Sequence, residues 1–450
     1  MYKSIIFLVM SLLTVTCGIN QKEKQAGREI TPRTVSWAEN ASIYEVNIRQ
    51  YTPEGTFKAF AAHLPRLKAL GVDILWFMPV TPISEARRKG SLGSYYAVRD
   101  YRKVNPEYGT LEDFRQLVKE AHRLGFHVLV DWVANHTGWD NPLIEQHPDW
   151  YTHKDGKIVS PVEDWSDVAD LNYDNREMRN YMIESLKFWI KETDIDGFRC
   201  DMAAMVPTDF WEEARLELDR VKPVFMLAEA WEPALTEKAF DACYGWDLHH
   251  LMNDLAKGRK DGTALYSYFH KVDTLYPART MILNFIDNHD ENSWQGSVKE
   301  RMGEAHRVYA VMTYTVPGIP LMYTGQEAGL DKRLAFFEKD SVDWSKSPEL
   351  ADFYRKLNTL KRDCPALAAG EDKGEFTILR HDNEKHIFAF ERKKGSQVLF
   401  VALNLTAENQ ELKLDEPRKG AFTDYFEGKE IPVLHTLFLP ANGYRVLVKR

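Results

Sequence analysis

From residue 43 to residue 323 the chain alternates between short apolar runs and longer amphipathic stretches. The short runs are rich in β-branched and aromatic residues, and they predict strands at 43–47, 74–79, 127–133, 197–202, 224–231, 242–246, 281–286 and 319–323. The stretches between them space their apolar residues as helices do; one follows a capping signal at Thr110. Strands that alternate with helices form parallel sheets with right-handed crossovers, so the pattern predicts an α/β protein with a closed (β/α)8 TIM barrel.

Two regions depart from this alternation. Residues 135–175, after the third predicted strand, are rich in Asp, Pro and Trp. A connection of this length is usually functional, so we expect a short domain inserted on the carboxyl-terminal face of a barrel built from 40–134 and 176–367. After residue 367 apolar and polar residues alternate between turn residues, which predicts a C-terminal antiparallel β-sandwich over 368–450.

The first seventeen residues have the pattern of a secretory signal. Lys3 precedes an apolar run at 5–13 that is too short to span a bilayer. The run leads to Cys17, which resembles the cleaved and lipidated cysteine of bacterial lipoproteins, although Thr16 is unusual before such a cysteine. We expect export across the inner membrane and a lipid anchor at the bacterial envelope, in the periplasm or at the outer membrane. Residues 18–39 would be a flexible tether. Plain secretion with an unused cysteine is the alternative.

Composition narrows the classes of function. The chain has 58 Lys and Arg against 67 Asp and Glu, a formal net charge of −9. This acidic balance argues against nucleic acid as a partner, because phosphate binding requires a basic face. A hydrophobic fraction of 44% and an aromatic fraction of 12% exclude disorder. Four cysteines are too few for a disulfide scaffold and match no zinc spacing, so Cys200, Cys243 and Cys364 are expected to be buried free thiols.

Polar residues gather where four of the predicted strands end, which in a barrel is where catalytic residues lie. The four ends are Asp131-Trp-Val-Ala-Asn135-His136, Gly197-Phe-Arg199-Cys-Asp201, Glu229-Ala-Trp231 and Asp287-Asn-His289-Asp290. Carboxylates on one rim raise one another's pKa, and proteins use such clusters to bind metals or to transfer protons. Arg199 close to Asp201 favours an ionised nucleophile, and Glu229 beside the apolar Trp231 favours a protonated general acid. This pair of roles is typical of glycoside hydrolases.

These four segments resemble, in order, the four signature regions of glycoside hydrolase family 13, the α-amylase superfamily, which includes secreted bacterial lipoproteins. Residues 168–172 resemble a fifth region in the family's domain B. Residues 93–101 resemble the segment whose tyrosine stacks on the sugar. The resemblance covers residues 40–450, and it implies the barrel, a short domain B at 135–175 and the C-terminal sandwich.

The resemblance also implies roles in a retaining double displacement. Asp201 would be the nucleophile, Glu229 the general acid and base, and Asp290 the stabiliser of the transition state. Retaining enzymes hold the first two carboxyl groups about 5–5.5 Å apart. The residues implied to bind substrate are Tyr96, His136, Arg199 and His289. Asp131 is expected to support Arg199 without contacting the substrate.

No cofactor is required for this chemistry, but many family members bind calcium between the barrel and domain B. The ligands implied here are Asn135, Asp170 and the backbone carbonyl of Met205, all oxygen donors of the kind that calcium prefers. The chain departs from the family after the nucleophile, where Ala204 and Met205 stand in place of a Lys-His pair that contacts the leaving-side sugar. The subsites that bind the leaving part of the substrate must therefore be formed by other residues. The resemblance consequently does not imply strict endo-amylase specificity.

The sequence thus predicts a hydrolase that cleaves α-1,4-glucosidic bonds in starch, maltodextrins or related oligosaccharides. The alternative among enzymes is a relative acting as a glucanotransferase, an α-glucosidase or a disaccharide isomerase. The alternative outside enzymes is a non-catalytic glucan-binding lipoprotein. The expected partner is the α-glucan itself, and membrane contact is expected only through the anchor at Cys17.

Overall fold

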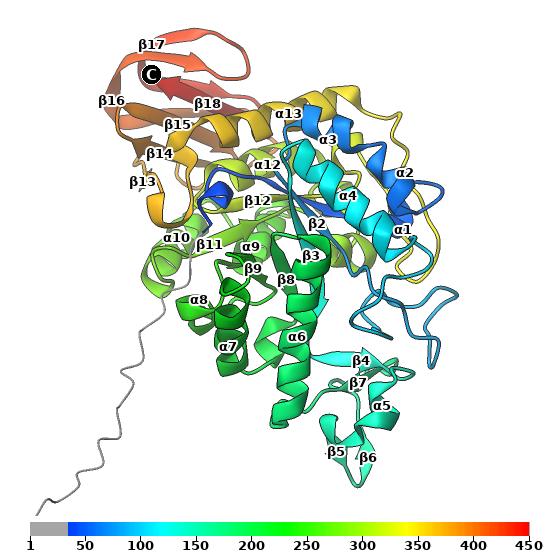
Figure 1. The fold of residues 1–450 in the computed structure, drawn as a ribbon. Coiled ribbons are helices and arrows are strands. Elements are labelled where there is room, and N and C mark those ends of the chain that lie inside the picture. Colours follow the sequence, from blue (N-terminus) through cyan, green and yellow to red (C-terminus); the bar gives the residue numbers. More distant parts are fainter. Residues whose placement is uncertain (1–34, 450) are drawn as a thin grey trace, which may run out of the picture. The chain divides into compact units, whose positions relative to one another are not determined.

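The computed structural model describes residues 35–449, so the predicted signal, the anchor cysteine and most of the tether lie outside the described residues. Parallel strands form a closed barrel in the order β1-β12-β11-β10-β9-β8-β3-β2 (Figure 1). Their bounds are β1 Ile43–Val46, β2 Ile74–Phe77, β3 His127–Val133, β8 Gly197–Asp201, β9 Phe225–Ala228, β10 Ala242–Tyr244, β11 Met281–Asn284 and β12 Ile319–Tyr323. The predicted barrel is confirmed, and each strand lies within the range that the apolar pattern predicts.

The barrel strands present alternate residues to two cores. One set, which includes Ile43, Leu129 and Leu227, forms a cluster inside the barrel with residues of β2, β10, β11 and β12. The other set packs against the surrounding helices. Because residues i and i+2 of a strand share a face, the inner face continues from these apolar residues to polar ones at the carboxyl ends. Barrel geometry alone therefore gathers polar side chains at one end of the interior.

Helices cover the barrel from outside. The principal ones are α3 Leu64–Leu70, α4 Leu111–Arg123, α6 Arg176–Thr193, α7 Thr208–Asp219, α9 Trp246–Ala256, α10 Thr263–Leu275, α12 His306–Thr315 and α13 Pro348–Asp363. Shorter helices are α1 Ile48–Tyr51, α2 Phe57–Ala61, α5 Leu143–Gln146, α8 Pro233–Lys238 and α11 Val298–Met302. Helix α4 begins as predicted, because Thr110 and Asp113 cap each other's backbone N–H groups. No helix among residues 35–449 has the length and apolar character needed to cross a bilayer.

The long connection between β3 and α6 is an ordered segment at the carboxyl end of the barrel. It contains β4 His136–Gly138, β5 His153–Lys154, β6 Lys157–Ile158 and β7 Val168–Asp170. Strands β4 and β7 pair antiparallel, with His136 opposite Asp170 (Figure 1). The hydroxyl of Tyr101 donates to the His136 carbonyl at 2.8 Å, and that of Tyr173 donates to the Ala134 carbonyl at 2.7 Å. These bonds fix both ends of the segment to the barrel.

The C-terminal strands form an antiparallel sheet in the order β13-β14-β15-β18-β16-β17. Their bounds are β13 Glu375–Ile378, β14 Ile387–Lys394, β15 Gln397–Asn404, β16 Gln410–Asp424, β17 Glu430–Leu439 and β18 Tyr444–Lys449. Strand β16 pairs with β18 only at Thr423 and Asp424. The β16–β17 hairpin and the other strands of the sheet enclose a separate hydrophobic core. The opposite face of β14 and β15 packs on the barrel helices. The predicted C-terminal antiparallel domain is confirmed.

Cysteines behave as the sequence predicts within the described residues. Cys200, Cys243 and Cys364 are buried and none of them forms a disulfide. Burial raises the pKa of all three thiols above the ordinary value. They are therefore core residues of low nucleophilicity.

A buried lysine joins the barrel to the segments on either side of it. Lys361 of α13 is 1% exposed, and its Nζ donates to the carbonyls of Glu39, Gly318 and Leu367 at 3.3, 3.0 and 2.6 Å. The Lys361 side chain thus links three segments, namely the residues before β1, the start of β12 and the connection to the C-terminal sheet.

We expect Lys361→Met to destabilise the protein, because it keeps the apolar stem but leaves buried carbonyls without their donor. The loss should be about 1–3 kcal/mol in the free energy of unfolding, measured by urea denaturation. Lys373→Met, at an exposed lysine beside the same connection, is the matched control and should leave the midpoint unchanged. Equal midpoints for the two variants would contradict this role.

Candidate active site

Arg199 stands at the centre of the polar cluster. Its side chain is completely buried, and it lies in the middle of β8, two residues before the strand ends at Asp201. Nη1 donates to Asp131 Oδ1 at 2.9 Å and to Asp201 Oδ1 at 3.1 Å, while Nη2 lies 3.0 Å from Glu229 Oε2. Nε donates to the hydroxyl of Tyr244 at 3.1 Å. Only the planar fork of an arginine reaches carboxylates from three neighbouring strands in this way.

Asp131, which was predicted to support Arg199, is one of its carboxylate partners. It is 3% exposed and also accepts hydrogen bonds from Trp76 Nε1 at 3.2 Å and from the Tyr96 hydroxyl at 3.1 Å. Burial raises the pKa of Asp131 to about 6, although the charge of Arg199 opposes that shift. With all its partners donating, Asp131 serves to hold Arg199 and Tyr96 in place.

Asp201 and Glu229 face the same guanidinium from adjacent strands. Asp201 ends β8, Glu229 follows β9, and each residue is less than a tenth exposed. Burial raises the pKa of Asp201 well above its usual range, and the neighbouring Glu229 raises it further, while Arg199 lowers it. A carboxyl group whose pKa is raised by burial and by a second carboxylate is typical of the acid–base pairs of enzymes.

The backbone after Asp201 orients Glu229. The N–H of Met202 donates to Glu229 Oε2 at 2.8 Å. Met202 has a φ of 42°, in the left-handed region that residues other than glycine rarely occupy. Such conformations concentrate at functional sites. The N–H at the start of this left-handed turn reaches the carboxylate of the next strand.

His289 and Asp290 follow β11. His289 Nδ1 lies 2.5 Å from Glu45 Oε1, and its Nε2 lies 2.8 Å from the Tyr96 hydroxyl and 3.4 Å from Asp290 Oδ2. Burial alone would lower the pKa of His289, but the carboxylates of Asp290 and Glu45 outweigh it and raise the pKa to about 9. Asp290 is more open, with 38% of its side chain exposed, so a ligand can reach it.

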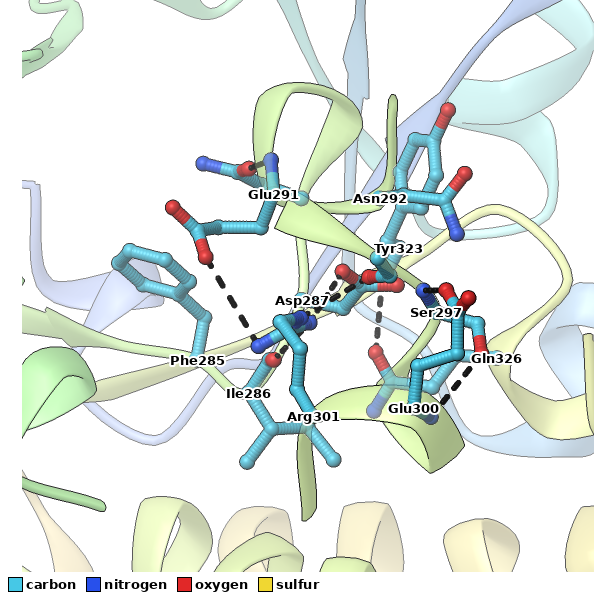
Figure 2. A network of polar contacts seen from close by, with 12 residues as sticks. Phe285, Ile286, Asp287, Glu291, Asn292, Ser297, Glu300, Arg301, Tyr323 and Gln326 are labelled. Carbon is cyan, nitrogen blue, oxygen red and sulfur yellow. Dashed lines mark hydrogen bonds and ion pairs between the residues drawn. The ribbon is translucent and has the colours of Figure 1, made fainter. Parts of the chain in front are cut away.

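A second buried arginine supports this segment from behind (Figure 2). Arg301 Nη2 donates to the Ile286 carbonyl at 2.8 Å and to Asp287 Oδ1 at 2.7 Å. Its Nη1 lies 3.8 Å from Glu291 Oε2. Arg301 therefore holds the residues on both sides of His289 and Asp290. Burial raises the pKa of Asp287 to about 7 despite the opposing charge of Arg301.

The remaining predicted sugar-binding residues lie beside this cluster. The ring of Tyr96 stacks on His289 with centroids 5.4 Å apart. His136 is buried, burial lowers its pKa to about 4, and its ring lies 5.6 Å from that of Trp165. In residues 35–449 no hydrogen bond or ion pair joins His136 directly to Asp201, Glu229 or Asp290. His136 is thus neutral and belongs to the side of the site formed by the inserted segment.

Two exposed tryptophans stand on the rim. Trp231, two residues after Glu229, is 54% exposed. Trp294 is 50% exposed, and its Nε1 donates to Asp290 Oδ1 at 3.3 Å. Trp132, in contrast, is fully buried in the core. Exposed indole faces beside carboxylates are suited to stack on sugar rings.

The predicted calcium ligands lie where the inserted segment meets the barrel. Asp170 is half-buried, burial raises its pKa, and no cationic side chain of the described residues lies within 4 Å of it. Asn135 Nδ2 lies 3.3 Å from His136 Nδ1, and Met205 ends a turn at Ala203–Met205. No group of three or more His, Cys, Asp or Glu side chains in residues 35–449 is arranged to hold a metal. An uncompensated half-buried carboxylate nevertheless fits a cation, so calcium stays a prediction.

Four residues that contact the charged groups of the site were not predicted from the sequence. Glu45, Trp76, Tyr244 and Trp294 all contact its charged groups. Glu45 carries a visible signal, because it is the single charge in the apolar strand Ile43–Val46. The aromatic residues carry none, since a core aromatic residue and a site aromatic residue look alike in sequence.

Comparisons with known proteins agree with this geometry. The family described as "Alpha amylase, catalytic domain" matches residues 29–377, and that described as "Maltogenic Amylase, C-terminal domain" matches residues 376–446. Alpha-amylase MalA of Haloarcula japonica is 27% identical over 410 residues, which are 88% of this chain and 59% of that protein. Maltogenic alpha-amylase of Bacillus acidopullulyticus is 25% identical over 423 residues, which are 87% of this chain and 70% of that protein.

Solved structures are similar over nearly the whole chain. Maltogenic alpha-amylase AmyB from Thermotoga neapolitana has a TM-score of 0.85 at 30% identity, covering 92% of this chain and 99% of that one. An alpha-amylase from Lactobacillus plantarum has a TM-score of 0.84 at 30% identity, covering 92% of this chain and 100% of that one. The alpha-amylase from Geobacillus thermoleovorans, solved in complex with acarbose, has a TM-score of 0.79 at 25% identity, covering 93% of this chain and 99% of that one.

Proposed function

Because this chain belongs to the α-amylase family of glycoside hydrolases, we propose that it hydrolyses α-1,4-glucosidic bonds in malto-oligosaccharides, starch or related oligosaccharides with retention of configuration. The observation that carries the proposal is the shared contact of Asp201 and Glu229 with Arg199 at the ends of adjacent strands. The names of the relatives, which include maltogenic amylases and cyclomaltodextrinases, support the substrate class. The chain spans only 59% of the length of MalA, so substrate and bond are proposed here for this chain on its own residues.

In the first step Asp201 attacks the anomeric carbon. Its Oδ1 is held by Arg199, and no hydrogen bond of the described residues engages Oδ2, so Oδ2 is the attacking atom. Glu229 accepts the Met202 N–H through Oε2, which leaves Oε1 to carry the proton. That proton passes to the glycosidic oxygen as the bond between carbon and oxygen breaks. The products of this step are a glycosyl ester on Asp201 and a free leaving group.

In the second step water attacks the same carbon. Glu229, now ionised, takes a proton from the water, and the ester bond to Asp201 breaks. Two inversions give net retention. Asp290, open to solvent, would bind hydroxyls of the sugar and stabilise the cationic transition state, with His289 beside it. Trp231 and Trp294 would offer stacking faces on either side.

We expect incubation of the pure protein with maltoheptaose to yield shorter saccharides with new reducing ends, released first as the α-anomer and detected by proton NMR. Asp201→Asn should reduce the rate on the order of 10⁴-fold, because the covalent step is lost. Glu229→Gln should do so through loss of the proton donor. Glu237→Gln, at an exposed carboxylate, is the matched control and should retain full activity. Only longer or rearranged products, with no net gain of reducing ends, would indicate a transferase or isomerase instead.

For calcium, we propose that Asn135, Asp170 and the Met205 carbonyl hold one ion, which would tie the inserted segment to the barrel and take no part in the chemistry. Millimolar calcium should then raise the thermal unfolding midpoint of the wild type relative to protein in EGTA. Asp170→Asn should abolish that difference, while Asp174→Asn, at an exposed neighbour, should preserve it. An unchanged wild-type midpoint, or an equal response in Asp170→Asn, would refute the site.

For location, we propose export and lipid anchoring at Cys17, on the sequence pattern alone. The full chain expressed in a bacterium should incorporate radiolabelled palmitate and enter the detergent phase of a Triton X-114 extract. Cys17→Ser should lose both properties. A wild-type protein that stays in the aqueous phase without label would indicate plain secretion or no export.

A further inference from the structure

Glu45 is a charged residue in an apolar place. It lies in β1 between Tyr44 and Val46, and its side chain has no exposed surface. The inner face of a barrel strand is a costly location for a carboxylate unless a cation or a hydrogen-bond donor compensates it. Within the described residues its one close polar partner is His289, at 2.5 Å from Oε1, and Oε2 has no hydrogen bond. Whether Glu45 is ionised therefore depends on the protons and charge of His289.

Hydrogen-bond directions fix the protons around His289. Asp131 accepts from Arg199 and Trp76, and the Tyr96 hydroxyl donates its single proton to Asp131 as well. The Tyr96 oxygen, 2.8 Å from His289 Nε2, can then only accept, so Nε2 carries a proton. A second proton must lie between Nδ1 and Glu45 Oε1, since two acceptors do not approach to 2.5 Å without one. The pair of Glu45 and His289 thus holds two protons in total.

The charges around the Glu45–His289 pair favour the state in which both protons lie on the imidazole. The groups that face His289 from the surrounding elements are Glu45, Asp290, Tyr96, Asp131 and Arg199. Of these, Arg199 is the only cation, and it is already shared among Asp131, Asp201 and Glu229. Among the described residues, His289 is the remaining side chain that can place a positive charge beside both Glu45 and Asp290.

We infer that Glu45 is a positioning residue that holds His289 as an imidazolium, whose Nε2–H is shared between the Tyr96 oxygen at 2.8 Å and, on the side of Asp290 at 3.4 Å, the sugar hydroxyls that Asp290 binds. This inference deepens the proposed function and rests on it for the sugar. A cation that donates to a hydroxyl makes a stronger hydrogen bond than a neutral imidazole does. His289 would thereby bind the sugar as a charged donor while Glu45 fixes its ring from the inner face of the barrel.

The protonation state is tested first, without any substrate. Protein labelled with ¹⁵N-histidine should show both ring nitrogens of His289 protonated at pH 7, with the signal assigned by His289→Gln. In Glu45→Gln the side chain still accepts from Nδ1 but carries no charge, so the titration midpoint of His289 should fall by about 1–3 pH units. A neutral His289 in the wild type, or an unmoved midpoint in Glu45→Gln, overturns the inference whether or not malto-oligosaccharides are substrates. The wild-type arm decides the matter even if the variant does not fold.

Kinetics then test the consequence for the sugar. In Glu45→Gln, His289 loses its charge only at pH values above its lowered titration midpoint. At low pH the imidazole is charged in both proteins, so the wild-type to Glu45→Gln ratio of kcat/KM should approach 1. It should grow to about 10- to 1000-fold at high pH, as the shift of 1–3 units dictates. A ratio that is the same at every pH would reduce Glu45 to a structural residue and overturn the inference.

The matched control is Asp241→Asn. Asp241 is equally buried, but it pairs with Arg215 at 2.9 Å before the start of β10, at the opposite end of the barrel strands. Loss of its charge should lower stability, since it removes one of the two carboxylates, Asp219 and Asp241, that pair with the buried Arg215. It should move neither the His289 titration nor the pH dependence of kcat/KM, and a shift of either in this control would overturn the assignment to Glu45.

Discussion

The site depends on one guanidinium held without solvent among carboxylates. Arg199 contacts Asp131, Asp201 and Glu229 within 3.1 Å, and none of these groups is more than a tenth exposed. Carboxylates this close would repel one another in the absence of the cation, and their full ionisation would be unfavourable even in its presence. The arrangement therefore divides the carboxylates by role: Asp131 anchors Arg199 and Tyr96, while Asp201 and Glu229 form a pair in which Glu229 raises the pKa of Asp201.

The barrel supplies this arrangement through its strand geometry. Adjacent parallel strands bring Asp131 opposite Arg199 and Val133 opposite Asp201, and the next strand leads to Glu229. Rigid neighbours then set the details. The left-handed Met202 orients Glu229, and Arg301 secures the turn that carries His289 and Asp290. Positions set by strands and buried ion pairs are more exact than loops alone would give, which suits a reaction that needs two carboxyl groups at a defined separation.

Much of this was predictable from the sequence, for a physical reason. The strands of a parallel barrel are apolar on both faces and short, so they stand out as runs, and the residues after them share one rim. That is enough to bring together Asp131, Arg199, Asp201, Glu229 and Asp290. Glu45 stands out as the single charge of its strand, but it was not predicted, because its partner His289 lies 244 residues away and no local pattern links the two. The φ of Met202 and the exposure of Trp294 likewise arise only when strands and turns pack together.

The charges of the site also explain how a cationic transition state is favoured there. Among the described residues, the cations that pair with Glu45, Asp131, Asp201, Glu229 and Asp290 are Arg199 and His289, so the carboxyl groups outnumber the cations. An oxocarbenium-like sugar would bring the missing positive charge, and it would be stabilised by groups already fixed in place. A neutral sugar in the ground state gains less from the same field. The excess of buried negative charge, costly to the folded protein, is thus the feature that distinguishes the transition state from the substrate.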